Sequence, residues 1–165
     1  MGGDESVPRS WQEEIEWLQL YTQLRDQLLE SLNPEDLHFK AGGDNPSLGE
    51  QCLIIGEIQR SYLDSFQTFT QDFEYRYPEP SLAGDLTGLK DWFADLDRQL
   101  FDRLAAFPKE VVEQQTIDRG QDFIVDFKTQ LDIYREALII FYGKVSVYLK
   151  AMEKELPARW AHWIE

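Results

Sequence analysis

Apolar residues recur at helical spacing in four long stretches of the chain. In the clearest stretch, near the C-terminus, apolar positions follow one another in steps of four and three: Phe127, Leu131, Tyr134, Leu138, Phe141, Val145, Tyr148 and Met152. A pattern sustained over about seven turns is typical of a bundle helix with coiled-coil-like packing. Similar stripes cover residues 10–33, 47–69 and 85–107. The pattern therefore predicts four amphipathic helices.

Capping signals mark the start of two of these helices. Ser10 is followed three residues later by Glu13, and Ser47 is followed at the same spacing by Glu50. A serine before the first turn and a glutamate three residues on can each satisfy a free backbone N–H, which is the capping-box arrangement. We therefore expect the first helix to begin after Ser10 and the second after Ser47.

The connection before the last helix, residues 108–126, has a less clear pattern. Within it, Asp118-Arg119-Gly120 is typical of a turn, flanked by short extended arms at Gln115–Ile117 and Phe123–Val125. We predict an all-α four-helix bundle with a long irregular connection before the last helix. The whole chain, residues 1–165, is expected to form a single helical domain, with residues 1–9 mobile.

The charge balance argues against two classes of partner. The chain carries 31 acidic and 16 basic residues, for a net charge of −15. Binding to a phosphate backbone or to an anionic lipid surface relies on basic residues that displace counterions. We therefore expect neither nucleic acid nor membrane as a partner.

Cysteine content and hydropathy bear on location. Cys52 is the one cysteine, so no intrachain disulfide can form, and we expect a buried, unreactive thiol there. The longest strongly apolar run, 137–142, is far shorter than the ~20 residues that a membrane span needs. No secretory signal precedes the first helix, so we expect a cytoplasmic protein.

Two segments carry a family resemblance. Ser47-Leu48-Gly49-Glu50-Gln51 opens the second predicted helix, and Phe141-Tyr142-Gly143-Lys144, followed by Val147-Tyr148-Leu149-Lys150, lies in the last one. In order and spacing they resemble the DinB/YfiT-like superfamily of bacterial four-helix bundles. That family often shows Ser/Thr-x-Gly-Glu at the first place and His-Arg-Gly-Gln at the second. The resemblance implies a DinB-like bundle.

The resemblance also implies a metal site, from which this sequence departs. In the family, three histidines commonly bind a divalent metal, one on the second helix and a His-x-x-x-His pair on the last, and some members are similar to thiol-dependent transferases and isomerases. The corresponding positions here are Ile54, Ala137 and Phe141. The chain has two histidines, His38 and His162, so a three-histidine site cannot be built. We expect these three apolar side chains to fill the bundle centre, with no metal or other cofactor.

Two functional hypotheses follow. The first is a metal-free binding or interaction module, whose partners would be a small apolar ligand or a second copy of the chain. Its pocket would combine Ile54, Ala137 and Phe141 with polar groups from Gln59, Tyr134 and Glu57, although a stripe of this kind is more often simply core.

The second hypothesis is an enzyme with a relocated site. His38, Glu50 and Glu57, with Tyr134 nearby, would hold a metal or a small substrate at the mouth of the bundle. The simpler interpretation makes Glu50 a helix cap, Glu57 a solvated charge and His38 a loop residue. Gly143 adds a further signal, because a glycine inside a helix costs ~1 kcal/mol relative to alanine. We expect either a closely packed neighbour or room for a ligand there.

Overall fold

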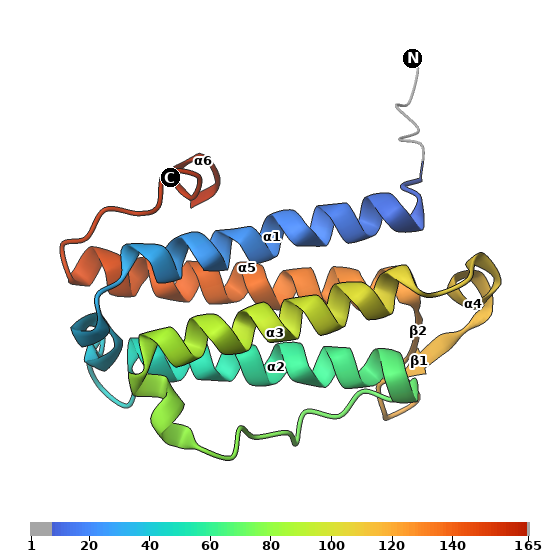
Figure 1. Ribbon diagram of the computed structural model, residues 1–165, viewed down its shortest axis with the longest axis horizontal. Helices are drawn as coiled ribbons and strands as arrows, with labels where there is room; N and C mark the ends of the chain where they lie inside the picture. Colours follow the sequence, from blue (N-terminus) through green and yellow to red (C-terminus); the bar gives the residue numbers. More distant parts are fainter. Residues whose placement is uncertain (1–7, 165) are drawn as a thin grey trace.

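Four long helices form the body of the molecule (Figure 1). The computed structural model describes residues 8–164, with side chains from residue 8 to residue 162. The helices are α1 (Trp11–Ser31), α2 (Leu48–Thr68), α3 (Leu86–Ala105) and α5 (Phe127–Ala151). The described chain is thus mostly helical, as the hydrophobic pattern predicts. Residues 1–7, which make up most of the expected mobile lead, lie outside the described residues.

The four helices surround one core. α2 packs against α3 and α5, and α1 packs against the same two helices. α1 and α5 run in one direction, whereas α2 and α3 run in the other (Figure 1). Because α2 and α3 are parallel, the chain between them returns along the length of the bundle through residues 69–85 and ends in the short helix η2 (Pro80–Gly84). A second short helix, η1 (Pro34–His38), lies between α1 and α2.

The connection before α5 contains a short helix and a hairpin. α4 (Lys109–Gln114) precedes β1 (Thr116–Asp118), which pairs antiparallel with β2 (Ile124–Asp126). Each strand buries its central residue against the core. In the turn, Arg119 donates a 2.7 Å hydrogen bond to the side chain of Gln130 on α5. The predicted turn with two extended arms is therefore confirmed, with each arm displaced by one residue.

Side-chain caps start all four long helices. Both predicted capping boxes are confirmed: the hydroxyls of Ser10 and Ser47 accept from the backbone three residues on, and the matching glutamates accept from the serine N–H at 2.6 Å. The carboxylates of Asp85 and Asp126 cap α3 and α5 in the same way. Each cap is worth ~1 kcal/mol, so local sequence fixes where each helix begins.

Two glycines of α2 allow close packing on its covered side. A Cβ on Gly49 would lie 1.8 Å from the backbone oxygen of Ala83 in η2, and one on Gly56 would lie 2.2 Å from the ring of Trp92 on α3. Only a residue without a side chain permits these approaches. The glycine of the Ser-x-Gly-Glu segment therefore serves to seat η2 against the start of α2.

The C-terminal segment folds back onto α1. Trp160 is fully buried, and its indole N–H donates to the backbone oxygen of Leu24 at 3.0 Å. Its ring lies 4.9 Å from that of Tyr142 on α5. The short helix α6 (Ala161–Ile164) follows. Across residues 8–164, no helix has the length and apolar character needed to cross a membrane.

Candidate functional site

Three residues that sequence analysis singled out lie together between α2 and α5. Ile54 of α2 and Ala137 and Phe141 of α5 line one groove of about 200 Å³. The rest of the lining consists of Gln51, Ile55, Ile58, Ile140 and Lys144. The positions at which the family resemblance implies metal ligands thus face a common space. None of the three side chains carries a nitrogen, oxygen or sulfur, so they do not fit the implied metal.

The groove is open to solvent and is not the bundle centre. Phe141 is buried, but Ile54 is 41% exposed and Ile140 is 58% exposed. On α2 the neighbouring residues Cys52 and Ile55 take the inward positions, which turns Ile54 toward the rim. The prediction that these residues fill the centre is therefore wrong for Ile54, which lies at the rim, whereas Phe141 belongs to the core and Ala137 is half-buried.

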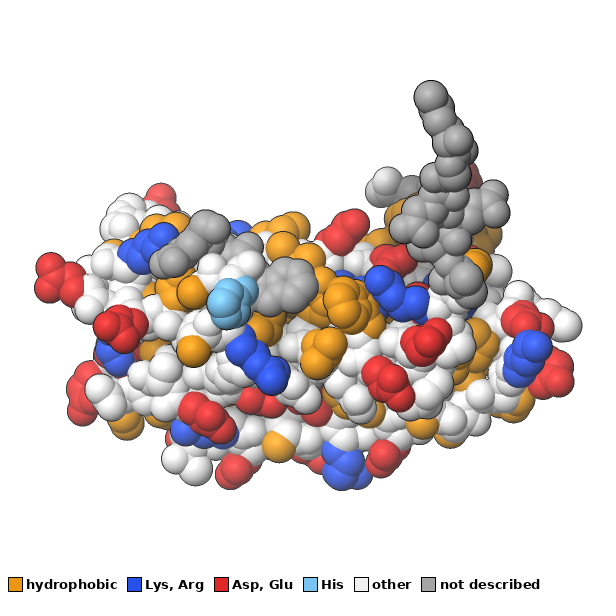
Figure 2. Space-filling view, turned by 90° about the horizontal axis from the view of Figure 1, so that it is seen from above, with side chains coloured by type: hydrophobic (Ala, Val, Ile, Leu, Met, Phe, Trp, Pro, Cys, Tyr) orange, Lys and Arg blue, Asp and Glu red, His pale blue; other side chains and the backbone are white. Residues whose placement is uncertain are grey.

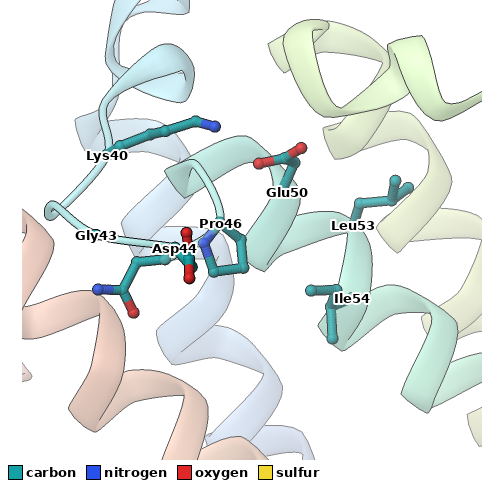
Figure 3. A pocket seen from close by; sticks show the side chains of 8 residues that line it. Lys40, Gly43, Asp44, Pro46, Glu50, Leu53 and Ile54 are labelled. Atoms are coloured by element: carbon teal, nitrogen blue, oxygen red, sulfur yellow. The ribbon is translucent and has the colours of Figure 1, made fainter.

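A second hollow adjoins this groove at Ile54. It has a volume of about 550 Å³ and lies between α2 and the loop of residues 40–46 (Figure 3). The loop turns tightly. Lys40 and Ser47 form an antiparallel β-bridge at its base, and Gly42 and Gly43 adopt positive φ angles of 101° and 58°. Ile54 lines both spaces, so the apolar groove leads into the loop hollow.

Two charged residues near the groove and the loop hollow, Lys144 and Glu50, differ in their interactions. Lys144 is the one charged residue that lines the groove, and it forms no ion pair within the part of the chain that the structure describes. In the loop hollow, Glu50 is committed to its capping role. The hydrogen bond from the backbone N–H of Ser47 lowers the pKa of this carboxyl, with a smaller contribution from Lys40. Lys144 therefore offers the free positive charge at the groove.

The bundle centre is closed by a buried polar cluster. Gln59 of α2 accepts from the Arg25 guanidinium at 2.7 Å and donates to Asp97 of α3 at 2.6 Å. Arg25 of α1 also donates to Asp97 at 2.5 Å and lies over the ring of Phe93, 4.1 Å from its centroid. The Arg25 side chain is 0% exposed. Three helices are thus tied together by one charge-assisted network.

Sequence analysis identified one member of this cluster and missed two. Gln59 was expected among the polar groups of the pocket, and a buried polar group needs a hydrogen-bond partner. Its partners, Arg25 and Asp97, were not identified. A signal was available for Arg25, which lies seven residues after Leu18 and seven before Leu32, both of them core residues.

Tyr134 and Cys52 also lie in the closed centre. The Tyr134 ring lies 4.8 Å from that of Tyr62, and the Tyr134 hydroxyl has no hydrogen-bond partner among the described residues. Burial raises the pKa of Tyr134 well above its usual value and that of the Cys52 thiol to about 12, so both stay protonated at neutral pH. Neither Gln59 nor Tyr134 lines the groove, so the expected pocket divides into an open apolar part and a closed polar part.

The alternative metal set is not assembled. Glu57 accepts from the backbone N–H of Tyr77 at 2.9 Å and lies 4.0 Å from Arg76, so it anchors the returning connection. Glu50 caps α2, and His38 is exposed on η1. Within the described residues, no three side chains of His, Cys, Asp or Glu are grouped so as to hold a metal ion. The structure therefore does not group His38, Glu50 and Glu57 as metal ligands, and the view of Glu57 as a solvated charge is wrong.

Gly143 does not mark close packing. A Cβ at this position would have nothing within 4 Å, because the residue lies on the outward side of α5. The expectation of a closely packed neighbour within the chain is wrong. The structure shows open space beside the helix at Gly143, and the alternative, room for a ligand, stays a prediction.

A further hollow of about 260 Å³ lies on the α1 side of the molecule. It is lined by Trp17, Leu20, Tyr21, Leu24, Arg159 and His162. Figure 2 looks down on this face and shows apolar side chains gathered in its middle. His162 is the only candidate from sequence analysis that it contains, and the groove between α2 and α5 brings together more of them.

Comparison with known proteins adds no assignment. No protein-family model matches the chain, and no curated protein matches it either. Its function has to be inferred from the groove and from the residues around it.

Proposed function

We propose that this chain is a divergent DinB-like bundle that acts as a metal-free binding module and takes a small apolar ligand in the groove between α2 and α5. The observation that carries the proposal is the convergence of Ile54, Ala137 and Phe141 on one open space. Apolar side chains in place of the family's metal ligands would keep the space between α2 and α5. They would make it suited to an apolar ligand instead of a metal ion. The single, buried cysteine agrees with a cytoplasmic location.

The lining of the groove suggests the class of ligand. Its volume of about 200 Å³ lies below the ~300–1,000 Å³ typical of sites for drug-sized molecules, which favours a short chain or a single ring. Covering the exposed surface of Ile54 and Ile140 would contribute ~25 cal/mol per Å² of apolar area. Lys144 at the edge would attract an anionic end group. A medium-chain carboxylate combines these properties.

Titration calorimetry with sodium decanoate, below its micelle concentration, tests the proposal. We expect saturable binding with one site, and at least tenfold weaker binding to Ile54→Glu, which places a carboxylate in the groove. Ile124→Glu is the matched control, because Ile124 is also an exposed isoleucine (60%, against 41% for Ile54) and lies on the distant hairpin. Decanol in place of decanoate isolates the charge: Lys144→Gln should weaken binding of the acid and leave that of the alcohol unchanged.

Two results would contradict the proposal. The first is absence of saturable binding of both decanoate and decanol to the wild-type protein. The second is equal binding to Ile54→Glu and Ile124→Glu, which would place the ligand elsewhere.

A further inference from the structure

The outward face of α5 carries exposed apolar residues on either side of Gly143, with Lys144 beside them. Ile139 is 51% exposed, and Ile140 and Val147 are each 58% exposed. Gly143 lies between them, with open space where a Cβ would be. The outward face of α3 differs, since it exposes five charged residues: Lys90, Asp91, Asp95, Arg98 and Asp102. In a chain with a net charge of −15, an exposed apolar stripe of this kind is typical of an interface.

The ends of the stripe carry opposite charges. Glu136 lies seven residues before Gly143, and Lys150 lies seven residues after it. Both are exposed, and neither forms an ion pair among the described residues. Ile139 and Val147 stand four residues on either side of the glycine. At the positions four and seven residues from Gly143, the face thus carries apolar residues on both sides of the glycine and opposite charges at its two ends.

This arrangement is complementary to a second copy of itself. Where two α5 helices cross antiparallel on a two-fold axis at Gly143, each residue before the glycine faces the residue the same distance after it on the other copy. Ile139 then meets Val147, and Glu136 meets Lys150. A parallel pair would instead place Glu136 against Glu136. The charges therefore select the antiparallel arrangement.

We propose that the chain forms a homodimer in which two α5 helices pack antiparallel and cross at Gly143. The absence of a side chain at the crossing point lets the two backbones approach, which explains a glycine in the middle of the longest helix. One helix face per subunit makes a small interface, so we expect a dissociation constant in the micromolar range. Ile140 belongs both to this face and to the groove, so the two sites share one side chain. The variants below change no residue that lines the groove, so they test the dimer separately.

Charge reversal tests the proposal by sedimentation equilibrium. E136K and K150E each place like charges together at both ends of the interface, and each should weaken dimerisation about tenfold. The double variant, E136K with K150E, restores opposite charges and should dimerise within about threefold of wild type. Within one helix these residues are ~21 Å apart, too far to pair, so recovery in the double variant requires a second chain.

A second pair of variants distinguishes an effect on dimerisation from an effect on folding. V147E should abolish dimerisation, whereas A94E, on the exposed face of α3, should leave it unchanged. Circular dichroism should show the helical content of both variants to be that of wild type. A wild-type protein that is monomeric throughout the micromolar range would overturn the proposal. So would a double variant that is no tighter than the single ones, or dimerisation of V147E equal to that of A94E.

Discussion

α2 meets two very different environments on its two sides. Toward α1 and α3, Gln59 joins a buried cluster in which Arg25 is 0% exposed and is held by Gln59 of α2 and Asp97 of α3. Toward α5, Ile54 borders a groove and is 41% exposed. Both positions attracted attention in the sequence, one as polar among apolar residues and one as apolar where a metal ligand was implied.

The difference separates stability from binding. A buried charged network fixes which helices meet, and removing one member leaves the others unpaired in a dry environment. The rim of the groove contributes little to folding, because Ile54 and Ile140 already contact water. Substitutions at the centre should therefore change the free energy of unfolding, whereas substitutions at the groove should change ligand affinity.

The largest effect is expected at the centre. Asp97→Ala leaves the buried guanidinium of Arg25 with only the half-exposed Asp26 as an acidic partner, and breaking a buried pair costs about 3–5 kcal/mol. Urea unfolding followed by circular dichroism measures the loss. Asp95→Ala, two residues away, removes a surface pair with Arg98 and should cost no more than ~1 kcal/mol. Equal losses in the free energy of unfolding for the two variants would show that the central cluster stabilises the fold no more than a surface ion pair does.

Gly49→Ala tests the covered side of α2. The added Cβ would lie 1.8 Å from the backbone oxygen of Ala83, which cannot move away as a flexible side chain could. We expect a loss of at least ~1–3 kcal/mol in the free energy of unfolding. A wild-type urea midpoint for this variant would mean that η2 does not rest on the start of α2.

Alkaline pH tests the closure of the centre through Cys52. Burial raises its pKa from 9.0 to about 12, so the folded protein keeps the thiol proton that the unfolded chain loses. The thiol's contribution to stability is complete below pH 9 and is lost as the pH rises toward 12, by up to ~1.4 kcal/mol per pH unit. Urea midpoints at pH 7, 9 and 11 measure this decline. Cys52→Ala should make it shallower, and an identical slope would indicate that the thiol is accessible to water.

The smallest effect is expected at the open side of α5. Gly143→Ala adds a methyl group into free space and improves helix propensity, so it should raise the free energy of unfolding by about 0.5–1 kcal/mol. The measurement is urea unfolding at a protein concentration low enough for the chain to be monomeric. A decrease under those conditions would show that the outward face of α5 is covered within one chain.

The helices themselves could be predicted because their signals are local. Ser10 and Ser47 each carry the glutamate that completes a capping box, and the hairpin around Asp118-Arg119-Gly120 has its own turn residues. The orientation of Ile54 could not be predicted, because a shift of one residue turns a side chain by about 100° and Ile55 next to it is equally apolar.

The order of the helices in space could not be predicted for a related reason. The apolar stripe of α3 is the same whether the helix runs parallel or antiparallel to α2, so the pattern does not reveal that residues 69–85 return along the bundle. That direction decides which residues face Arg25. Asp97 therefore resembled an ordinary solvated aspartate until the helices were placed.

Backbone amide chemical-shift mapping during a titration with decanoate tests the central claim most directly. The largest shifts are predicted at Ile54, Ala137 and Phe141, around the groove, with Gln59 and Tyr134 in the closed centre nearly unchanged. Shifts concentrated at the centre or over the α1 hollow, or no saturable shifts at all, would contradict the account.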